Sequence, residues 1–127
     1  MKKLTTTLCL TVALLFGCTG VCKSADFQKA LTAHLSGDYA TALREWKPLA
    51  EQGNPRAQSN LGFMYANGQG VLQDYVYAHM WYNIAASRGN EVASENRDNV
   101  AKRMTPADLS TAQKLARECV RKKYKGC

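Results

Sequence analysis

Apolar side chains recur at helical spacing through most of this chain, and short breaks rich in Gly, Asn, Asp and Pro separate the runs. No run alternates apolar and polar residues in the way that a half-buried strand requires. The pattern therefore predicts an all-α chain. The predicted helices cover residues 26–36, 38–52, 55–67, 74–88, 91–103 and 106–123.

The breaks between these segments carry residues that favour helix ends. Asp74 suits an N-cap position, where a side-chain oxygen accepts hydrogen bonds from free backbone N–H groups. Gly53 and Gly89 each follow an alanine-rich run, where a left-handed residue ends a helix well. Asn54 then stands before Pro55, whose fixed φ suits the first helical position. These signals support the predicted boundaries.

The middle of the chain repeats itself after a shift of 36 residues. Asp38-Tyr39 returns as Asp74-Tyr75, and the segment 50–54 returns at 86–90. A period between 20 and 50 residues is typical of stacked helical arrays, in which each hairpin covers the apolar face of its neighbour. We therefore expect about three antiparallel hairpins in one domain over residues 26–127.

Residues 54–89 resemble one full unit of the Sel1-like repeat, a relative of the tetratricopeptide repeat. The match fades after Gly89, and we expect residues 90–123 to form capping helices. The resemblance implies a right-handed α/α superhelix, or solenoid, that serves as an adaptor or scaffold and lines a concave surface with its first helices. The matching residues are Ala57, Leu61, Gly62, Tyr65, Gly68, Gly70, Val71, Asp74, Ala78, Trp81, Tyr82, Ala85, Ala86 and Gly89.

One face of the helix at 55–67 is the candidate surface for a protein partner. It lies opposite the packing stripe of Ala57, Leu61 and Tyr65. Phe63 on this face is either an aromatic anchor for the partner or a contact with a neighbouring helix, and the sequence leaves both readings open. The candidate residues are Arg56, Ser59, Asn60, Phe63 and Asn67.

The first residues read as a secretory leader over 1–25. Lys2 and Lys3 precede an apolar run over 4–16, which is too short to span a bilayer, where ~20 apolar residues are needed. Cleavage is expected near Ser24 or Ala25, which gives a periplasmic or secreted protein without a transmembrane segment. Cleavage before Cys18, which follows a lipoprotein-like box, is the alternative and would give a lipid-anchored form.

Cysteine usage favours the first cleavage site, because it leaves only Cys119 and Cys127, an even number suited to an oxidising compartment. A continuous helix would hold their Cα atoms ~12 Å apart, beyond the ~7 Å limit for a disulfide. The helix must therefore end after Cys119, with a return turn at 124–126. The prediction is a disulfide that staples a small terminal loop; a reactive or metal-binding thiol pair is the rival.

The chain is basic, chiefly at its C-terminal end. Without residues 1–25, which hold three lysines and no acid, the formal net charge falls from +7 to +4. The basic end is either a solvated helix terminus that complements the helix dipole or a patch with weak attraction for anionic surfaces. Nucleic acid is not expected as a partner of an exported protein. The basic residues are Lys114, Arg117, Arg121, Lys122, Lys123 and Lys125.

Catalytic chemistry is not expected. Some cysteine-rich relatives of the resembled family are linked to β-lactams, but no serine here precedes a lysine by three residues. His34 and His79 stand alone on their helices, so neither a metal nor a cofactor is predicted. The leading interpretation is a non-catalytic protein-interaction adaptor of the cell envelope. The alternatives are an enzyme acting on the cell wall or on β-lactams, and a basic peripheral binder of anionic surfaces.

Overall fold

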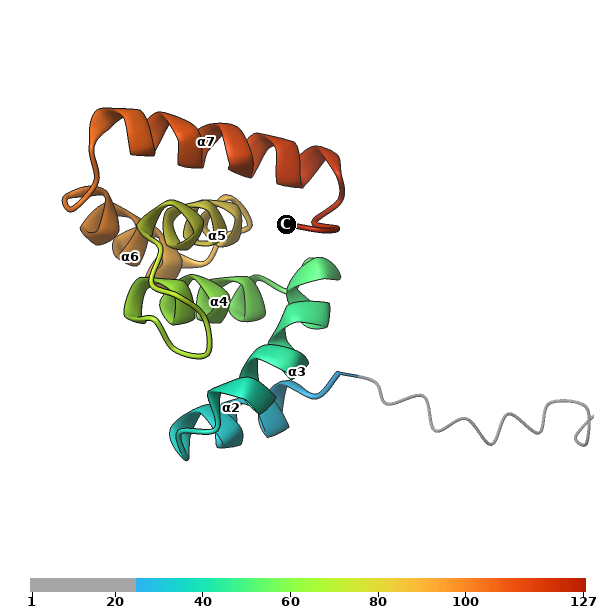
Figure 1. Ribbon diagram of the computed structural model, residues 1–127. Coiled ribbons are helices and arrows are strands. Elements are labelled where there is room, and N and C mark those ends of the chain that lie inside the picture. Colours follow the sequence, from blue (N-terminus) through green and yellow to red (C-terminus); the bar gives the residue numbers. More distant parts are fainter. Residues whose placement is uncertain (1–24) are drawn as a thin grey trace, which may run out of the picture.

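The computed structural model describes residues 25–127, and this part of the chain consists of helices joined by short connections, without strands (Figure 1). The predicted leader, with Cys18 and Ser24, lies outside the described residues except for Ala25. The helices are α2 (Phe27–Leu35), α3 (Tyr39–Glu51), α4 (Pro55–Asn67), α5 (Tyr75–Ser87), α6 (Glu91–Ala101) and α7 (Pro106–Arg121). The all-α prediction is confirmed, and each predicted boundary lies within about two residues of the observed one.

The predicted caps explain why the helices begin and end where they do. The Asn54 side chain accepts hydrogen bonds from the backbone of Arg56 and Ala57, and Asp74 caps α5 in the same way. Gly53 and Gly89 both adopt a φ of 90°, which lets the chain leave α3 and α5 without a steric penalty. The helix-capping residues predicted from the sequence are therefore confirmed.

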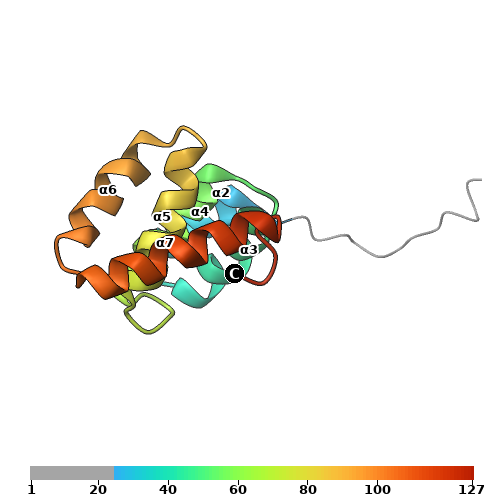
Figure 2. The ribbon, with the colours of Figure 1, turned by 90° about the horizontal axis from the view of Figure 1, so that it is seen from above.

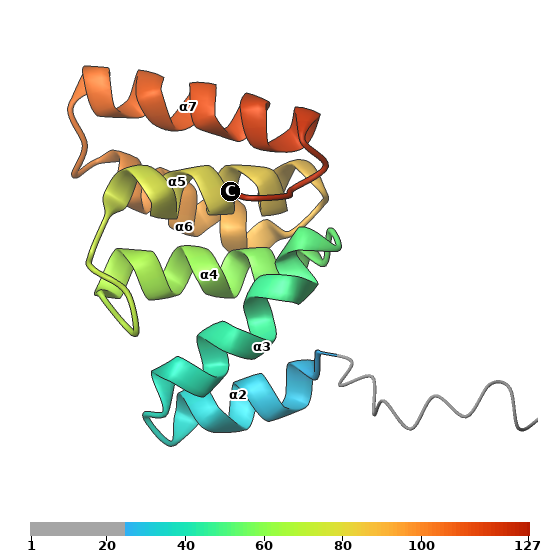
Figure 3. The same ribbon diagram turned by 45° about the vertical axis from the view of Figure 1, so that its right-hand side comes forward.

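The helices stack in chain order from α2 to α5 as two antiparallel hairpins, which form an all-α solenoid (Figure 3). Large side chains such as Trp46 and Trp81 pack against small ones, and Ala50 and Ala57 are fully buried. At Gly62 in α4, an added Cβ would lie 2.7 Å from Cδ1 of Tyr82 in α5. The missing side chain thus allows α4 and α5 to approach closely.

The last two helices differ from the closed third hairpin that was expected. In the described part of the chain, α6 packs on α5 and α4, whereas α7 packs on α5; α6 and α7 diverge from their connection (Figure 2). The physical reason lies in α5, which is apolar on most of its surface and buries seven residues. A helix that is hydrophobic all round needs covers on several sides, so α6 and α7 each cover a different side of it.

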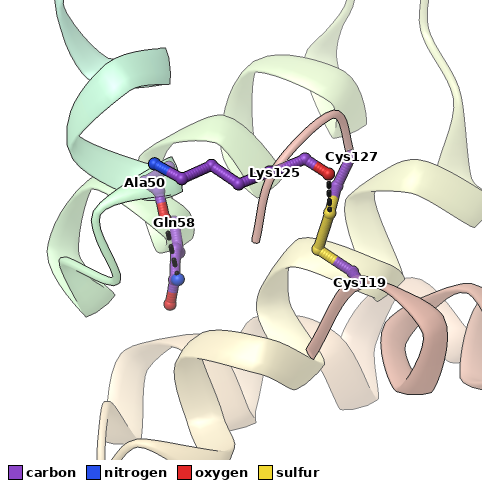
Figure 4. The surroundings of a disulfide bond; sticks show 5 residues. All are labelled: Ala50, Gln58, Cys119, Lys125 and Cys127. Atoms are coloured by element: carbon purple, nitrogen blue, oxygen red, sulfur yellow. Dashed lines mark hydrogen bonds between the residues drawn. A yellow bond between two sulfur atoms is a disulfide. The ribbon is translucent and has the colours of Figure 1, made fainter. Parts of the chain in front are cut away.

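Beyond α7 the chain reverses and returns to the core. Lys123 and Tyr124 adopt left-handed backbone conformations, and the Tyr124 amide donates to the Cys119 carbonyl over 2.9 Å. Cys119 and Cys127 are joined in a disulfide, with their Cα atoms 5.6 Å apart (Figure 4). The Tyr124 hydroxyl accepts a hydrogen bond from Arg88 at the end of α5. This terminal loop therefore ties the end of α7 to the end of α5.

Candidate functional site

Two hollows lie along α4, on the side of the molecule formed by the first helices of successive pairs. The larger, of about 470 Å³, lies between α4 and α6 and is here called the central groove. The smaller, of about 220 Å³, lies between α2, α4 and the start of α6 and is called the N-terminal hollow. The central groove is lined by Phe63, Ala66, Asn67, Gln73, Tyr75, Tyr82, Asn96, Asn99, Val100, Lys102 and Arg103.

The structure places all five candidate partner-binding residues along these hollows. Phe63 and Asn67 line the central groove, whereas Arg56, Ser59 and Asn60 line the N-terminal hollow. The five residues recur at spacings of three and four along α4 and so share one side of it. They differ in accessibility, because Ser59 is only 7% exposed and lies at the bottom of its hollow.

Phe63 combines the two roles that the sequence left open. Its ring packs edge-on against the ring of His34 in α2, with centroids 5.7 Å apart. The side chain is nevertheless 41% exposed and faces the central groove. His34 is in turn held by Gln69 of the α4–α5 connection, whose Oε1 accepts from the ring Nε2 over 2.7 Å. Phe63 is thus an aromatic group fixed from one side and accessible from the other.

Amide side chains form the walls of the central groove, and part of their hydrogen-bonding capacity is free. Asn67 donates through Nδ2 to the Phe63 carbonyl, which leaves its own Oδ1 available. Gln73 donates through Nε2 to the Ala66 carbonyl. The side chain of Asn96 makes no hydrogen bond to another described residue, so its amide keeps both its donor and its acceptor. Such groups match the alternating N–H and C=O of an extended peptide.

The charge of the central groove is positive. Lys102 donates to Asn99 over 3.3 Å and Arg103 donates to the Tyr75 hydroxyl over 3.3 Å, but neither is in a salt bridge with a described residue. No carboxylate lines the groove. At its floor, burial raises the pKa of Tyr82 to about 12, so its hydroxyl stays protonated near neutral pH. The groove can therefore attract an acidic ligand but offers no negative group of its own.

Sequence reasoning missed the residues that α6 and the following turn contribute. Asn96, Asn99, Lys102 and Arg103 fall in the segment predicted as capping helices and were not named as candidates. Their polarity was visible in the sequence, but their convergence on α4 follows from how α6 crosses α5. A signal was available in the spacing of Asn96 and Asn99, which places both amides on one helix face.

His79 also departs from what a lone helical histidine suggests. It is 3% exposed between α5, α6 and α7, and its Nδ1 is buried without a hydrogen-bond partner among the described residues. Burial lowers the pKa of His79, and the positive charge of Arg97 lowers it further, while Asp98 opposes the shift. In the sequence, the burial of His79 was signalled by the apolar character of α5 on all sides. A residue in the middle of such a helix is covered by the elements that pack around it.

The basic residues predicted on α7 and beyond, Lys114, Arg117, Arg121, Lys122 and Lys123, are all exposed. Arg117 and Arg121 border a third hollow, between α5 and α7. In residues 25–127, no three His, Cys, Asp or Glu side chains gather in a way that could hold a metal ion. None of the described helices is long and apolar enough to cross a bilayer.

Comparison with known proteins agrees with the repeat and the fold. A family model described as the Sel1 repeat matches residues 55–90. The crystal structure of a protective antigen present in uropathogenic Escherichia coli strains, which displays an SLR fold, is 30% identical in sequence and superimposes with a TM-score of 0.69. The match covers 77% of this chain and 23% of the antigen, so the chain spans about a quarter of the length of that protein.

Proposed function

This chain is a Sel1-like repeat protein, and from that premise we propose that it is a non-catalytic adaptor of the cell envelope, which binds an extended segment of another protein in the central groove. The Sel1-like repeat fold is that of a protein-interaction module. To this general role we add three proposals: the location in the cell envelope, the binding of an extended segment, and the groove residues that bind it. They rest on the geometry of α4 and α6 and on the features of an exported chain.

The observation that carries the proposal is the combination of an exposed aromatic ring with free amides in one groove. Phe63 is pre-oriented by His34 and so loses little side-chain entropy when a partner covers it, which suits an anchor residue. Asn67 of α4 and Asn96 of α6 both line the groove and can pair with the backbone of an extended segment. The Phe63 ring would thus supply affinity for the partner segment, and the asparagine amides would align its backbone.

Export is supported by two separate features. A leader is predicted over residues 1–25, and Cys119 and Cys127 form a disulfide, a bond that persists in oxidising compartments and is rare in the cytosol. We therefore place the module in the periplasm or outside the cell. Cleavage before Cys18 would attach the same module to a membrane by a lipid.

A capture experiment tests the groove. The protein over residues 26–127 is immobilised, exposed to an envelope extract under mild crosslinking, and compared with the Phe63→Ala variant by quantitative mass spectrometry. We expect one protein to be retained by the unmodified chain and to fall at least tenfold with Phe63→Ala, a loss of ~1.4 kcal/mol or more in binding. Thermal melting checks that the variant is folded, because the ring also contacts His34.

Leu72→Ala is the matched control for this experiment. Leu72 is 91% exposed in the α4–α5 connection and lines neither hollow along α4, so its removal tests for nonspecific apolar adhesion. Retention should be unchanged in this variant. Equal loss with Phe63→Ala and Leu72→Ala, or no specific retention at all, would count against the central groove as the binding surface.

A further inference from the structure

A second elongated depression lies on the opposite side of α6 from the central groove. Because α6 and α7 diverge over α5, they leave two adjoining hollows of about 290 and 530 Å³ that share Asn83 as a lining residue. We call the combined depression the trough. Along α7 it runs from Leu109 to Arg121, which corresponds to ~18 Å of helix. It is long enough to hold about three turns of another helix.

The floor of the trough is apolar toward its C-terminal end. Ile84 of α5 and Ala116 of α7 are almost completely buried there, and Val120 of α7 is 47% exposed at the edge. Two diverging helices on a third form the kind of straight, ridged depression into which a further helix packs. The shape and the exposed valine together indicate an apolar helix face as the occupant.

The charge around this end of the trough is positive and unbalanced. Arg117 and Arg121, one turn apart on α7, border the apolar floor and are exposed. No carboxylate lines this hollow, and neither arginine is in a salt bridge with a described residue. Asp98 lines the other hollow of the trough, but it is engaged by Arg97 at 3.0 Å. The occupant must therefore supply the negative charge.

We propose that the trough binds an acidic amphipathic helix of a partner protein. Apolar residues of this helix would cover the exposed part of Val120, and carboxylates beside them would pair with Arg117 and Arg121. The surface is separated from the central groove by α6 itself. The proposal is therefore independent of the segment bound along α4, and either surface can exist without the other.

A designed peptide tests this chemistry directly. The probe is a synthetic helix of about 14 residues with leucines at spacings of three and four and glutamates beside them; the comparison peptides carry lysines in place of the glutamates, or the same residues in scrambled order. Titration of isotope-labelled protein is followed by NMR. We expect shifts concentrated on α5 and α7 with the acidic amphipathic peptide only. An absence of shifts at millimolar peptide would overturn the proposal.

Charge-reversed variants locate the site. Arg117→Glu with Arg121→Glu should weaken binding of the acidic peptide at least tenfold and create binding of the lysine peptide. The matched control is Lys114→Glu with Lys122→Glu, which makes the same change in net charge on α7 and at its C-cap, outside the trough. This control should alter binding less than threefold. An equal loss in both double variants would reduce the effect to general electrostatics and overturn the proposal.

Two other occupants are distinguished in the same series. Vesicles of phosphatidylcholine and phosphatidylglycerol are used in a flotation assay, and light scattering measures the oligomeric state of the protein. Binding to vesicles that depends on Arg117 and Arg121, without peptide binding, would assign the trough to a lipid surface instead. A dimer that dissociates in the Arg117→Glu and Arg121→Glu double variant would assign it to a second copy. Either result would overturn the partner helix.

Discussion

At the scale of single residues, the contact between Gly62 and Tyr82 limits how α4 and α5 can be varied. A methyl group at Gly62 would lie 2.7 Å from the Tyr82 ring, which is itself buried and cannot move freely. We expect Gly62→Ala to lower the free energy of unfolding by about 1–3 kcal/mol, since the overlap outweighs the ~1 kcal/mol that alanine adds to an exposed helix. Urea denaturation measures the difference.

Ser110→Ala serves as the control for Gly62→Ala. Ser110 lies on the exposed side of α7, where the same kind of change affects only helix propensity. The Ser110→Ala protein should be as stable as the unmodified protein or slightly more stable. A Gly62→Ala protein as stable as this control would show that the two helices can separate at little cost.

His79 should make the stability of the protein depend on pH. Its pKa is lowered in the folded state, first by burial and then by Arg97, relative to about 6.5 in the unfolded chain. Between these two values the unfolded chain binds a proton that the folded protein does not. Stability should therefore be highest above pH 6.5 and fall as the pH falls below it, until the folded pKa is reached.

Urea denaturation at pH 7.5 and pH 5 compares the unmodified protein with His79→Gln, which cannot take up the proton. We expect the variant to lose less stability between the two values than the unmodified protein. His34→Gln is the control, because His34 is the other histidine of the chain and is only half-buried. An identical pH dependence in the His79→Gln protein would show that this ring is not responsible.

The position of individual side chains was the part of the site that the sequence predicted least well. The five residues chosen on α4 do line hollows, because helical spacing alone determines which side chains share a face. Ser59 was nevertheless expected at the surface and is buried, since its exposure depends on where α2 and α6 lie. Periodicity identifies a face, but it does not specify the neighbours that cover it.

At the scale of secondary-structure elements, the disulfide fixes the loop that follows α7. Replacing Cys119 and Cys127 by alanine should lower the free energy of unfolding by about 2–3 kcal/mol, because an open chain gains conformational entropy when it unfolds. The terminal loop should also lose its contact between Tyr124 and Arg88. Amide hydrogen exchange should therefore accelerate first at 120–127.

The comparison for the disulfide is Lys125→Ala, which alters the same loop but leaves the bond and the Tyr124 contact in place. This variant should keep both its stability and its exchange rates. If the double alanine variant also kept them, the loop would be held by packing alone.

Helix positions were predictable because caps and glycines act locally. Asn54 with Pro55, and Gly53 and Gly89 with positive φ, determine where the chain enters and leaves its helices whatever lies around it. The divergence of α6 and α7 was not predictable in this way. It arises from competition between two weakly apolar helices for one strongly apolar helix, α5, which is a property of three elements together.

At the scale of the whole molecule, the fold depends on covering α5 from several sides. A fragment of residues 25–90 keeps the two closed hairpins but exposes the surfaces of α5 that α6 and α7 bury, including those near His79 and Ile84. We expect this fragment to lose cooperative thermal unfolding, as followed by circular dichroism, whereas residues 25–127 unfold in one transition. A sharp transition in the fragment would show that one Sel1-like unit and the hairpin before it suffice for cooperative unfolding.

The modest burial of α6 determines how often this helix detaches from the rest of the fold. Ala93 and Val100 are the two buried residues of this helix, whereas α5 buries seven. Brief detachment of α6 should therefore be far more frequent than global unfolding, and its amides should exchange with solvent deuterium ahead of those in α4 and α5. Each such detachment removes one wall of the central groove and of the Leu109 end of the trough, whereas the end at Arg117 and Arg121 is lined by α5 and α7 and keeps its walls. A partner of the central groove would therefore meet an intermittent surface, and a partner of the arginine end a lasting one.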